Sequence, residues 1–243
     1  MTGTPAAPTK KSDLPVRTAS AVVMVIVVLG ALWVGGGIWA IFVGLVAAGV
    51  LMEFSRLVLA FEPRALPRLV WHVGGLIYVG LACATLIFER AYGPLPLLIL
   101  LATVVAVDVG AYFAGRAIGG AKIAPSISPS KTWAGLFGGM AGATLLLLFS
   151  ARNVLHLDWS ASMAGLLVVG PLIAVVAQAG DFFESWMKRR AGVKDSGKLI
   201  PGHGGLLDRV DGLLAVCFTI GMVMLGTVLL ALARGESLLP TPA

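Results

Sequence analysis

Acidic side chains occur at the polar ends of two apolar segments in this sequence. Asp208 and Asp211, in GGLLDRVDG, are three residues apart, so both carboxylates lie on the same face of a helix. In AQAGDFFESWMKR, Gln178, Asp181 and Ser185 also share one helix face. Neighbouring carboxylates repel each other unless a cation lies between them, and Mg²⁺ prefers hard oxygen ligands. The three aspartates therefore predict a Mg²⁺ site, although acids also occur at helix N-termini for electrostatic reasons alone.

Two further acids lie inside apolar segments. An ionisable residue in a membrane span costs about 2.5–3.5 kcal/mol, so it needs a partner or a cavity. Asp108, in AVDVGAYFAGR, shares a helix face with Tyr112 and Arg116, and it is either a partner of Arg116 or part of the site. Glu53, in LMEFSRL, precedes Arg56 by three residues, which predicts a structural ion pair on the helix surface.

Basic residues and hydroxyls gather in two polar segments. In ISPSKTWAG, Ser128, Lys131 and Thr132 precede an apolar segment, where hydroxyls, backbone N–H groups and a lysine suit a phosphate. Simple helix capping explains this segment equally well. The second segment, MKRRAGVKDSGKLIPGHGG, has glycines that allow close backbone approach. Its candidate phosphate-binding and neighbouring residues are Lys188, Arg189, Lys194, Asp195 and His203. Basic clusters beside spans also contact lipid headgroups.

The composition places all these residues in a membrane protein. The chain has 243 residues, of which 58% are hydrophobic and 12% charged, and its mean hydropathy is +0.95. A soluble domain of this size needs a more charged surface. A spanning helix needs about 20 apolar residues. Such stretches occur at 19–35, 37–60, 69–88, 94–116, 133–150, 162–183 and 206–232. We therefore predict an all-α polytopic integral membrane protein with about seven transmembrane helices.

The distribution of basic residues predicts how the bundle is oriented. Cytoplasmic loops collect Lys and Arg. With a cytoplasmic N-terminus, only Arg90, Arg152 and Arg234 fall on the opposite side. The loops after the second, fourth and sixth spans then face the cytoplasm, together with the active site of a protein expected in the cell (inner) membrane. Because the basic residues lie beside spans, no nucleic-acid partner is expected.

The predicted spans also divide the chain into regions. We expect a disordered cytoplasmic tail over 1–18 and an N-terminal transmembrane scaffold over 19–93. A catalytic transmembrane region follows over 94–232, with cytoplasmic loops at 117–132 and 184–205, and a C-terminal tail covers 233–243.

The segment Ser185–Asp211 resembles the signature of the CDP-diacylglycerol synthases, also called phosphatidate cytidylyltransferases. That signature is S-x-x-K-R-x4-K-D-x-G-x2-I-P-x-H-G-G-x2-D-R-x-D, and every fixed position is met. The stretches DVGAYFAGR from Asp108 and SPSKTWAG from Ser128, together with the pair Gly180-Asp181, resemble the same family. The resemblance covers about 94–232, whereas the N-terminal third is similar only as hydrophobic segments.

The resemblance implies a reaction, its substrates and a set of site residues. CTP and phosphatidate would give CDP-diacylglycerol and pyrophosphate in phospholipid biosynthesis at the lipid bilayer. Mg²⁺ is the implied cofactor, with a second cation as an option, and Asp181, Asp208 and Asp211 would hold it. These aspartates and Lys194 are the predicted catalytic residues. The predicted substrate-binding residues are Ser128, Lys131, Thr132, Lys188, Arg189, Asp195, His203 and Asp108.

Other functions stay open at this point. Another Mg²⁺-dependent lipid phosphotransferase would use CDP-diacylglycerol, but the usual D-G-x2-A-R motif of the CDP-alcohol phosphotransferases is absent. A lipid kinase would release a nucleoside diphosphate instead of pyrophosphate. An ion-coupled transporter would also carry intramembrane acids, although here the acids cluster near span ends. The oligomeric state stays open as well, with a homodimer as one option.

Overall fold

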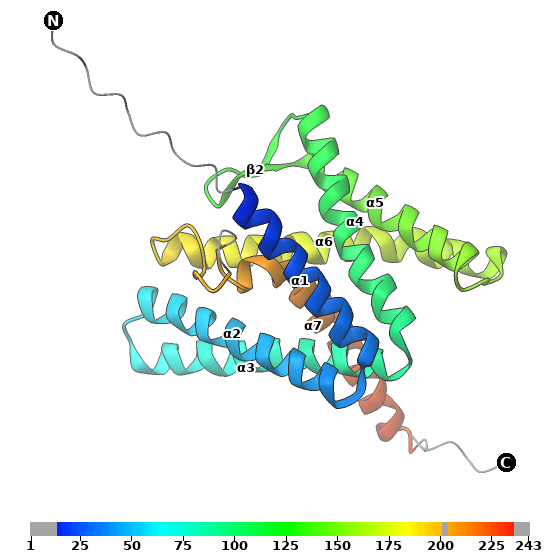
Figure 1. Cartoon of the computed structure of the whole chain (residues 1–243), viewed down its shortest axis with the longest axis horizontal. Helices are drawn as coiled ribbons and strands as arrows, with labels where there is room; N and C mark the ends of the chain where they lie inside the picture. The colour runs from blue at the N-terminus through cyan, green and yellow to red at the C-terminus, as the bar shows by residue number, and fades with distance from the viewer. Residues whose placement is uncertain (1–13, 201–203, 236–243) are drawn as a thin grey trace, which may run out of the picture.

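The computed structural model describes residues 14–200 and 204–235, and within them the chain folds into helices and one small sheet (Figure 1). The elements are α1 (Leu14–Val34), α2 (Gly36–Phe61), α3 (Ala65–Ala91), α4 (Pro94–Ala117), β1 (Lys122–Ala124), β2 (Ser128–Thr132), α5 (Trp133–Asn153), α6 (Trp159–Arg190) and α7 (Leu207–Ala233). Most of the two predicted tails lies outside the described residues.

Each of the seven apolar stretches forms a helix close to its predicted bounds. Six of the described helices, α2 to α7, are long and apolar enough to cross a membrane. The apolar part of α1, Thr18–Val34, is shorter than these. The predicted all-α polytopic membrane fold is therefore confirmed, while its orientation in the membrane stays a prediction.

Both predicted loops contain regular structure. α6 continues to Arg190, so the predicted loop 184–205 was wrong for its first residues. The helix outlasts the apolar run because Glu184 and Lys188 pair one turn apart and basic residues are favourable at a helix C-terminus. In the predicted loop 117–132, β1 and β2 pair as antiparallel strands.

The described helices pack as two groups joined through α6 and α7. α4 packs on α5 and α5 on α6, whereas α2 packs on α3 and α3 on α7 (Figure 1). The α4 and α5 backbones touch: a Cβ on Gly110 would lie 2.3 Å from the Gly138 carbonyl oxygen. Small residues allow this close approach of membrane helices. The packing fixes Asp108, on α4, relative to the segment that leads into α5.

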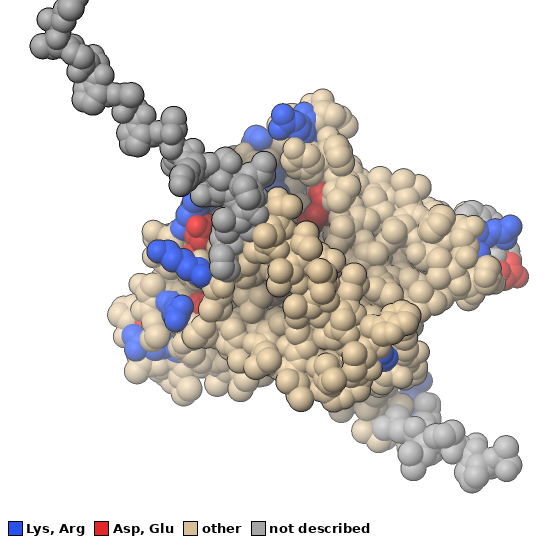
Figure 2. All heavy atoms as spheres, in the orientation of Figure 1, with Lys and Arg blue, Asp and Glu red and all other residues tan. Residues whose placement is uncertain are grey.

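The three loops that were predicted to share one side lie together at one end of the bundle. Arg189 Nε, on α6, donates to the Ile127 carbonyl oxygen before β2 at 3.3 Å. The guanidinium of Arg190 lies 5.9 Å from the ring centre of Phe61, at the end of α2. Figure 2 shows charged side chains mostly at the ends of the bundle and uncharged residues over its middle. This end holds the candidate site.

Candidate active site

A polar cavity of about 730 Å³ lies between α4, α6, α7 and the segments that join them. Its volume is in the range of small-molecule binding sites. Its lining includes most of the predicted site residues, namely Asp108, Lys131, Thr132, Asp181, Lys188, Arg189, Lys194, Asp195, Asp208 and Asp211. Among the remaining predicted residues, Ser128 is buried in β2 and does not line this cavity, and His203 lies outside the described residues.

One Lys–Asp pair connects the β2 strand to α6 inside this cavity. Lys131 Nζ contacts Asp181 Oδ2, and both side chains are 26% exposed. Ser185 Oγ donates a hydrogen bond to Asp181 Oδ1 at 3.3 Å, which confirms that these two residues share a helix face. Because water reaches both charged groups, a ligand can replace either partner at modest cost.

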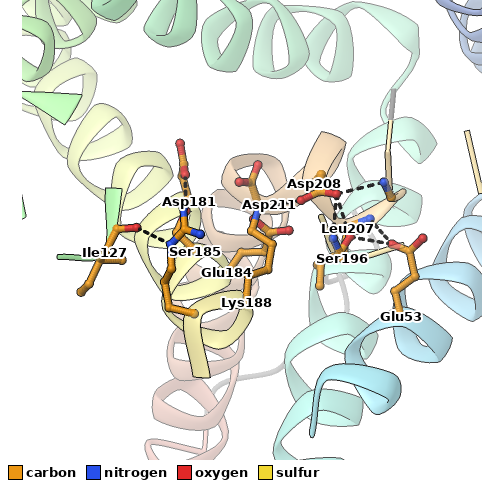
Figure 3. A network of polar contacts seen from close by, with 12 residues as sticks. Glu53, Ile127, Asp181, Glu184, Ser185, Lys188, Ser196, Leu207, Asp208 and Asp211 are labelled. Atoms are coloured by element: carbon orange, nitrogen blue, oxygen red, sulfur yellow. Dashed lines mark hydrogen bonds and ion pairs between the residues drawn. The ribbon is translucent and has the colours of Figure 1, made fainter. Parts of the chain in front are cut away.

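A second Lys–Asp pair connects α6 to the first turn of α7 and is more deeply buried (Figure 3). Lys188 Nζ lies 2.6 Å from Asp208 Oδ1 and 2.5 Å from Glu184 Oε2. Asp208 Oδ2 accepts hydrogen bonds from the Ser196 amide at 2.9 Å, the Ser196 hydroxyl at 3.0 Å and the Gly205 amide at 2.9 Å. Protein donors therefore occupy both Asp208 oxygens.

Glu53 does not form the predicted surface pair. Its carboxylate is fully buried, and Oε2 accepts hydrogen bonds from Ser196 Oγ at 2.9 Å and the Leu207 amide at 2.8 Å. Arg56 instead places Nη2 3.6 Å from Met52 Sδ on the exposed side of α2. The prediction was wrong because a spacing of three residues indicates a shared face without showing whether that face is buried. A structural role for Glu53 is retained.

Two other residues resolve alternatives that the sequence left open. Thr132 Oγ1 accepts a hydrogen bond from the Gly135 amide at 3.0 Å, so it caps α5 while it also lines the cavity. Asp108 and Arg116 both line the cavity, but they form no ion pair with each other in the described part of the chain. The interpretation of Asp108 as an internal partner of Arg116 was therefore wrong.

Sequence reasoning missed two members of the buried network, Glu184 and Ser196. Glu184 is 2% exposed, and its Oε1 atom has no hydrogen-bond partner among the described residues. Its position four residues before Lys188 was the available signal. Ser196 is also buried but occupies a variable position of the signature, so the motif alone carries no indication of its role.

The predicted metal ligands differ in how well they fit a cation. Asp208 fits poorly because its side chain is only 9% exposed and its two oxygens accept four hydrogen bonds from protein donors, whereas Asp181 is 26% exposed and has two such contacts. Asp181 and Asp211 line the cavity from α6 and α7 and, with Asp108, offer the carboxylate oxygens that Mg²⁺ prefers. Within 14–200 and 204–235, no three acidic, His or Cys side chains are close enough to enclose an ion. A Mg²⁺ here would need further ligands from phosphates and water, as is common for this ion.

An apolar pocket of about 470 Å³ adjoins the polar cavity. It is lined by Phe54, Val70, Trp71, Gly74, Gly75, Tyr78 and Phe183, from α2, α3 and α6. A narrow space beside it shares Phe54, Tyr78 and Phe183 with the apolar pocket. The same narrow space shares Glu184 and Asp211 with the polar cavity. This space holds only about 10 Å³, so the same side chains separate the apolar pocket from the polar cavity by a short distance.

The described fold and cavity define a polytopic membrane protein with a charged, ligand-sized site. The sequence pattern of the cytidylyltransferase family matches residues 63–227, and the chain belongs to this family. A phosphatidate cytidylyltransferase of Brucella melitensis is 46% identical over 149 residues, which are 60% of this chain and 53% of that protein. A protein of the same name from Rickettsia bellii is 34% identical over 211 residues, 84% of this chain and 88% of that protein.

The matches do not extend equally over the relatives. A phosphatidate cytidylyltransferase of Haemophilus influenzae is 39% identical over 154 residues, or 52% of its length. The chain thus spans about half the length of the Brucella and Haemophilus proteins. The family match covers the helices that line the polar cavity and begins after Glu53.

Proposed function

We propose that this protein condenses CTP with phosphatidate to give CDP-diacylglycerol and pyrophosphate. The observation that carries the proposal is the polar cavity, which basic residues line together with Asp181 and Asp211 and which lies near an apolar pocket. A nucleoside triphosphate and an anionic lipid headgroup need such a mixture of charges. The names of the relatives support cytidylyl transfer to phosphatidate as the reaction.

The chemistry requires little from a general base. A phosphatidate oxygen, already anionic, attacks the α-phosphorus of CTP and forms the new P–O bond. The bond between the α-phosphorus and the α–β bridging oxygen breaks, and pyrophosphate leaves with that electron pair. The difficulty is to bring two anions together in line, so positioning and positive charge supply most of the catalysis.

The basic residues of the cavity are proposed to hold the phosphates. Lys131 would exchange its contact with Asp181 for a phosphate oxygen, because this pair is accessible from the cavity. Lys194 and Arg189 line the same cavity and would contact further phosphate oxygens. Lys188 would act differently, since its ammonium already contacts both Glu184 and Asp208 within the protein. We therefore assign Lys188 to fixing α6 against α7.

The acidic residues divide in the same way. Asp181 and Asp211 would hold Mg²⁺ near the triphosphate, with Asp108 beside them and a second cation as an option. A bound Mg²⁺ supplies positive charge to the phosphates and to the departing pyrophosphate. Asp208 is proposed as a positioning residue, because its oxygens bind Lys188, Ser196 and Gly205.

The apolar pocket is proposed to take part of a phosphatidate acyl chain. Its aromatic lining suits hydrocarbon, and three of its residues also line the narrow space that Asp211 and Glu184 border. A lipid could thereby keep its chain in apolar surroundings while its phosphate reaches the polar cavity. The site would face the cytoplasm of a cell (inner) membrane, because CTP is a cytoplasmic solute and basic loops remain on that side.

Product identification tests this function directly. Purified protein in detergent would be incubated with phosphatidate, Mg²⁺ and CTP that carries ³²P at either the α- or the γ-phosphate. We expect α-label in the lipid fraction as CDP-diacylglycerol and γ-label in pyrophosphate. A lipid kinase would instead transfer γ-label to the lipid, and that result would refute cytidylyl transfer. Asp211→Asn is the matched variant and should form neither product at a measurable rate.

A further inference from the structure

We propose that Glu53 is a positioning residue for this reaction: it fixes the basic segment formed by residues 191–200 and 204–206 to the start of α7 and thereby orders the Asp208–Lys188 pair. We call the contacts among Glu53, Ser196, Leu207 and Asp208 the clamp. Its catalytic consequence rests on the proposed function, whereas its structural part can be tested without any assay of turnover. Glu53 lies before the part of the chain that matches the family.

The first argument is the position of the carboxylate between two separate parts of the chain. Glu53 Oε2 accepts a hydrogen bond from Ser196 Oγ at 2.9 Å and another from the Leu207 amide at 2.8 Å. Leu207 is the first residue of α7, so its amide is one that has no partner within the helix. A negative charge at this end is also favoured by the helix dipole. A residue of α2 thus completes the N-terminus of α7.

The second argument is that the neighbouring backbone leaves no room for side chains. A Cβ on Gly197 would lie 2.0 Å from Glu53 Oε1. One on Gly205 would lie 2.0 Å from Ser196 Oγ and 2.6 Å from Glu53 Oε2. Two glycines of the basic segment therefore enclose the carboxylate, which is fully buried. Glu53 and this segment fit each other closely.

The third argument is the chain of contacts that runs from Glu53 to the cavity (Figure 3). Ser196 Oγ lies 2.9 Å from Glu53 Oε2 and 3.0 Å from Asp208 Oδ2, and its single proton serves one of them at a time. The Ser196 amide also donates to Asp208, whose other oxygen binds Lys188. Displacing Ser196 from Glu53 would consequently disturb Asp208.

The clamp also determines where two cavity residues lie. Lys194 and Asp195 immediately precede Ser196 and line the polar cavity. Because Ser196 is held by hydrogen bonds, the backbone of the adjacent Asp195 can move only a little. Loss of the clamp should therefore reduce the catalytic rate of folded protein by loosening these groups. A purely structural Glu53 would change the folded fraction but not the rate per folded molecule.

The test compares Glu53→Gln with Glu62→Gln, a matched change near the same end of α2. Glu62 bonds to Arg64 at 2.9 Å, and that guanidinium lowers the pKa of the Glu62 carboxyl. Both variants replace a buried glutamate by glutamine, but Glu62 belongs to the C-terminal cap of α2 and, among the described residues, has no contact with the clamp. We expect hydrogen exchange at the Ser196, Gly205 and Leu207 amides to be at least about tenfold faster in Glu53→Gln. Exchange in α4 and α5 should not change, and Glu62→Gln should behave as the wild type.

Turnover provides the second readout. In folded Glu53→Gln we expect kcat to fall about tenfold or more, with a smaller change in KM for CTP. If Glu53 acts through Ser196, adding Ser196→Ala should lower kcat little further than the more damaging single change. If the double variant instead loses kcat by the product of the two single losses, Glu53 does not act through Ser196. Unchanged amide exchange in Glu53→Gln would overturn the clamp.

A second variant keeps the proposal testable if Glu53→Gln does not fold. Gly197→Ala approaches the clamp from the other side and should speed exchange at the same amides, whereas Gly226→Ala, where a Cβ meets open space, should not. If the Ser196 and Leu207 amides exchange as fast in the wild type as in Gly197→Ala, that result would contradict the clamp. Failure of the wild type to make CDP-diacylglycerol would refute the proposed function, and the exchange results would still decide the clamp.

Discussion

Two Lys–Asp pairs stand in one cavity and differ in almost every physical respect. The Lys131–Asp181 pair is 26% exposed at both side chains. In the Lys188–Asp208 pair the corresponding values are 14% and 9%. Lys188 also contacts Glu184, and Asp208 accepts three further hydrogen bonds from Ser196 and Gly205. The sequence stretches that resemble the family contain both pairs, but they do not show which pair is buried.

The difference in exposure between the two pairs shows which charges a ligand can reach. Removing one partner of a buried pair leaves the other as an uncompensated buried charge and lowers the stability of the fold by about 3–5 kcal/mol. An exposed pair typically contributes about 0–1 kcal/mol, since water replaces the lost contact. The accessible pair suits exchange with substrate phosphates, and the buried pair suits the fixing of α6 against α7. Substitutions in the two pairs should therefore separate activity from stability.

The largest expected effect comes from Asp208→Asn. It removes the charge that faces Lys188 and places an amide among donors, so the free energy of unfolding in detergent should fall by about 3 kcal/mol and turnover should be lost. Thermal unfolding and pyrophosphate release measure the two effects. Asp181→Asn is the matched change in the exposed pair and should lose turnover while its stability changes by at most about 1 kcal/mol. Equal destabilisation by both would contradict the distinction.

The lysines should show the same contrast with a smaller loss of activity. Lys131→Met removes a proposed phosphate contact, so we expect turnover to fall about tenfold to a hundredfold with stability close to the wild type. Lys188→Met leaves Glu184 and Asp208 buried without their cation and should lower the unfolding midpoint by several degrees. Thermal scans and initial rates on the same preparations measure both. A Lys131→Met protein less stable than Lys188→Met would reverse the assignment.

The apolar pocket should respond with the smallest effect. A Cβ on Gly74, which lines the pocket, meets open space, so Gly74→Leu should fill part of the pocket without a clash. We expect KM for long-chain phosphatidate to rise several-fold, with KM for CTP unchanged. Gly80→Leu lies on the same helix outside the pocket and serves as the control. An equal effect of Gly74→Leu on short-chain phosphatidate would argue against an acyl chain at this position.

The helices were predictable because span length and apolarity leave few alternatives in a membrane. Which residues line the cavity was also largely predictable. Lys194 and Asp211 occur in the signature and Asp181 in the pair Gly180-Asp181, and all three line the cavity. The continuation of α6 to Arg190 was missed because the prediction ended the helix with its apolar run.

The contacts within the cavity were not predictable from spacing. Asp208 and Asp211 share a helix face as predicted. Asp208, however, bonds to Ser196 and Gly205, which lie between α6 and α7 outside regular secondary structure, so helical spacing does not predict these contacts. Glu53 illustrates the same limit, because its partner Leu207 is 154 residues away in the sequence. Burial of a polar residue depends on which element packs against it, and that information is long-range.

The role of the polar cavity as the CTP site is tested most directly by the binding of CTP to purified protein, measured by calorimetry with Mg²⁺ present. We expect the Kd for CTP to rise at least about tenfold in Lys131→Met and to stay unchanged in Gly226→Ala, a site away from the cavity. CTP binding of wild-type strength in Lys131→Met would contradict the assignment of the accessible pair to the nucleotide phosphates.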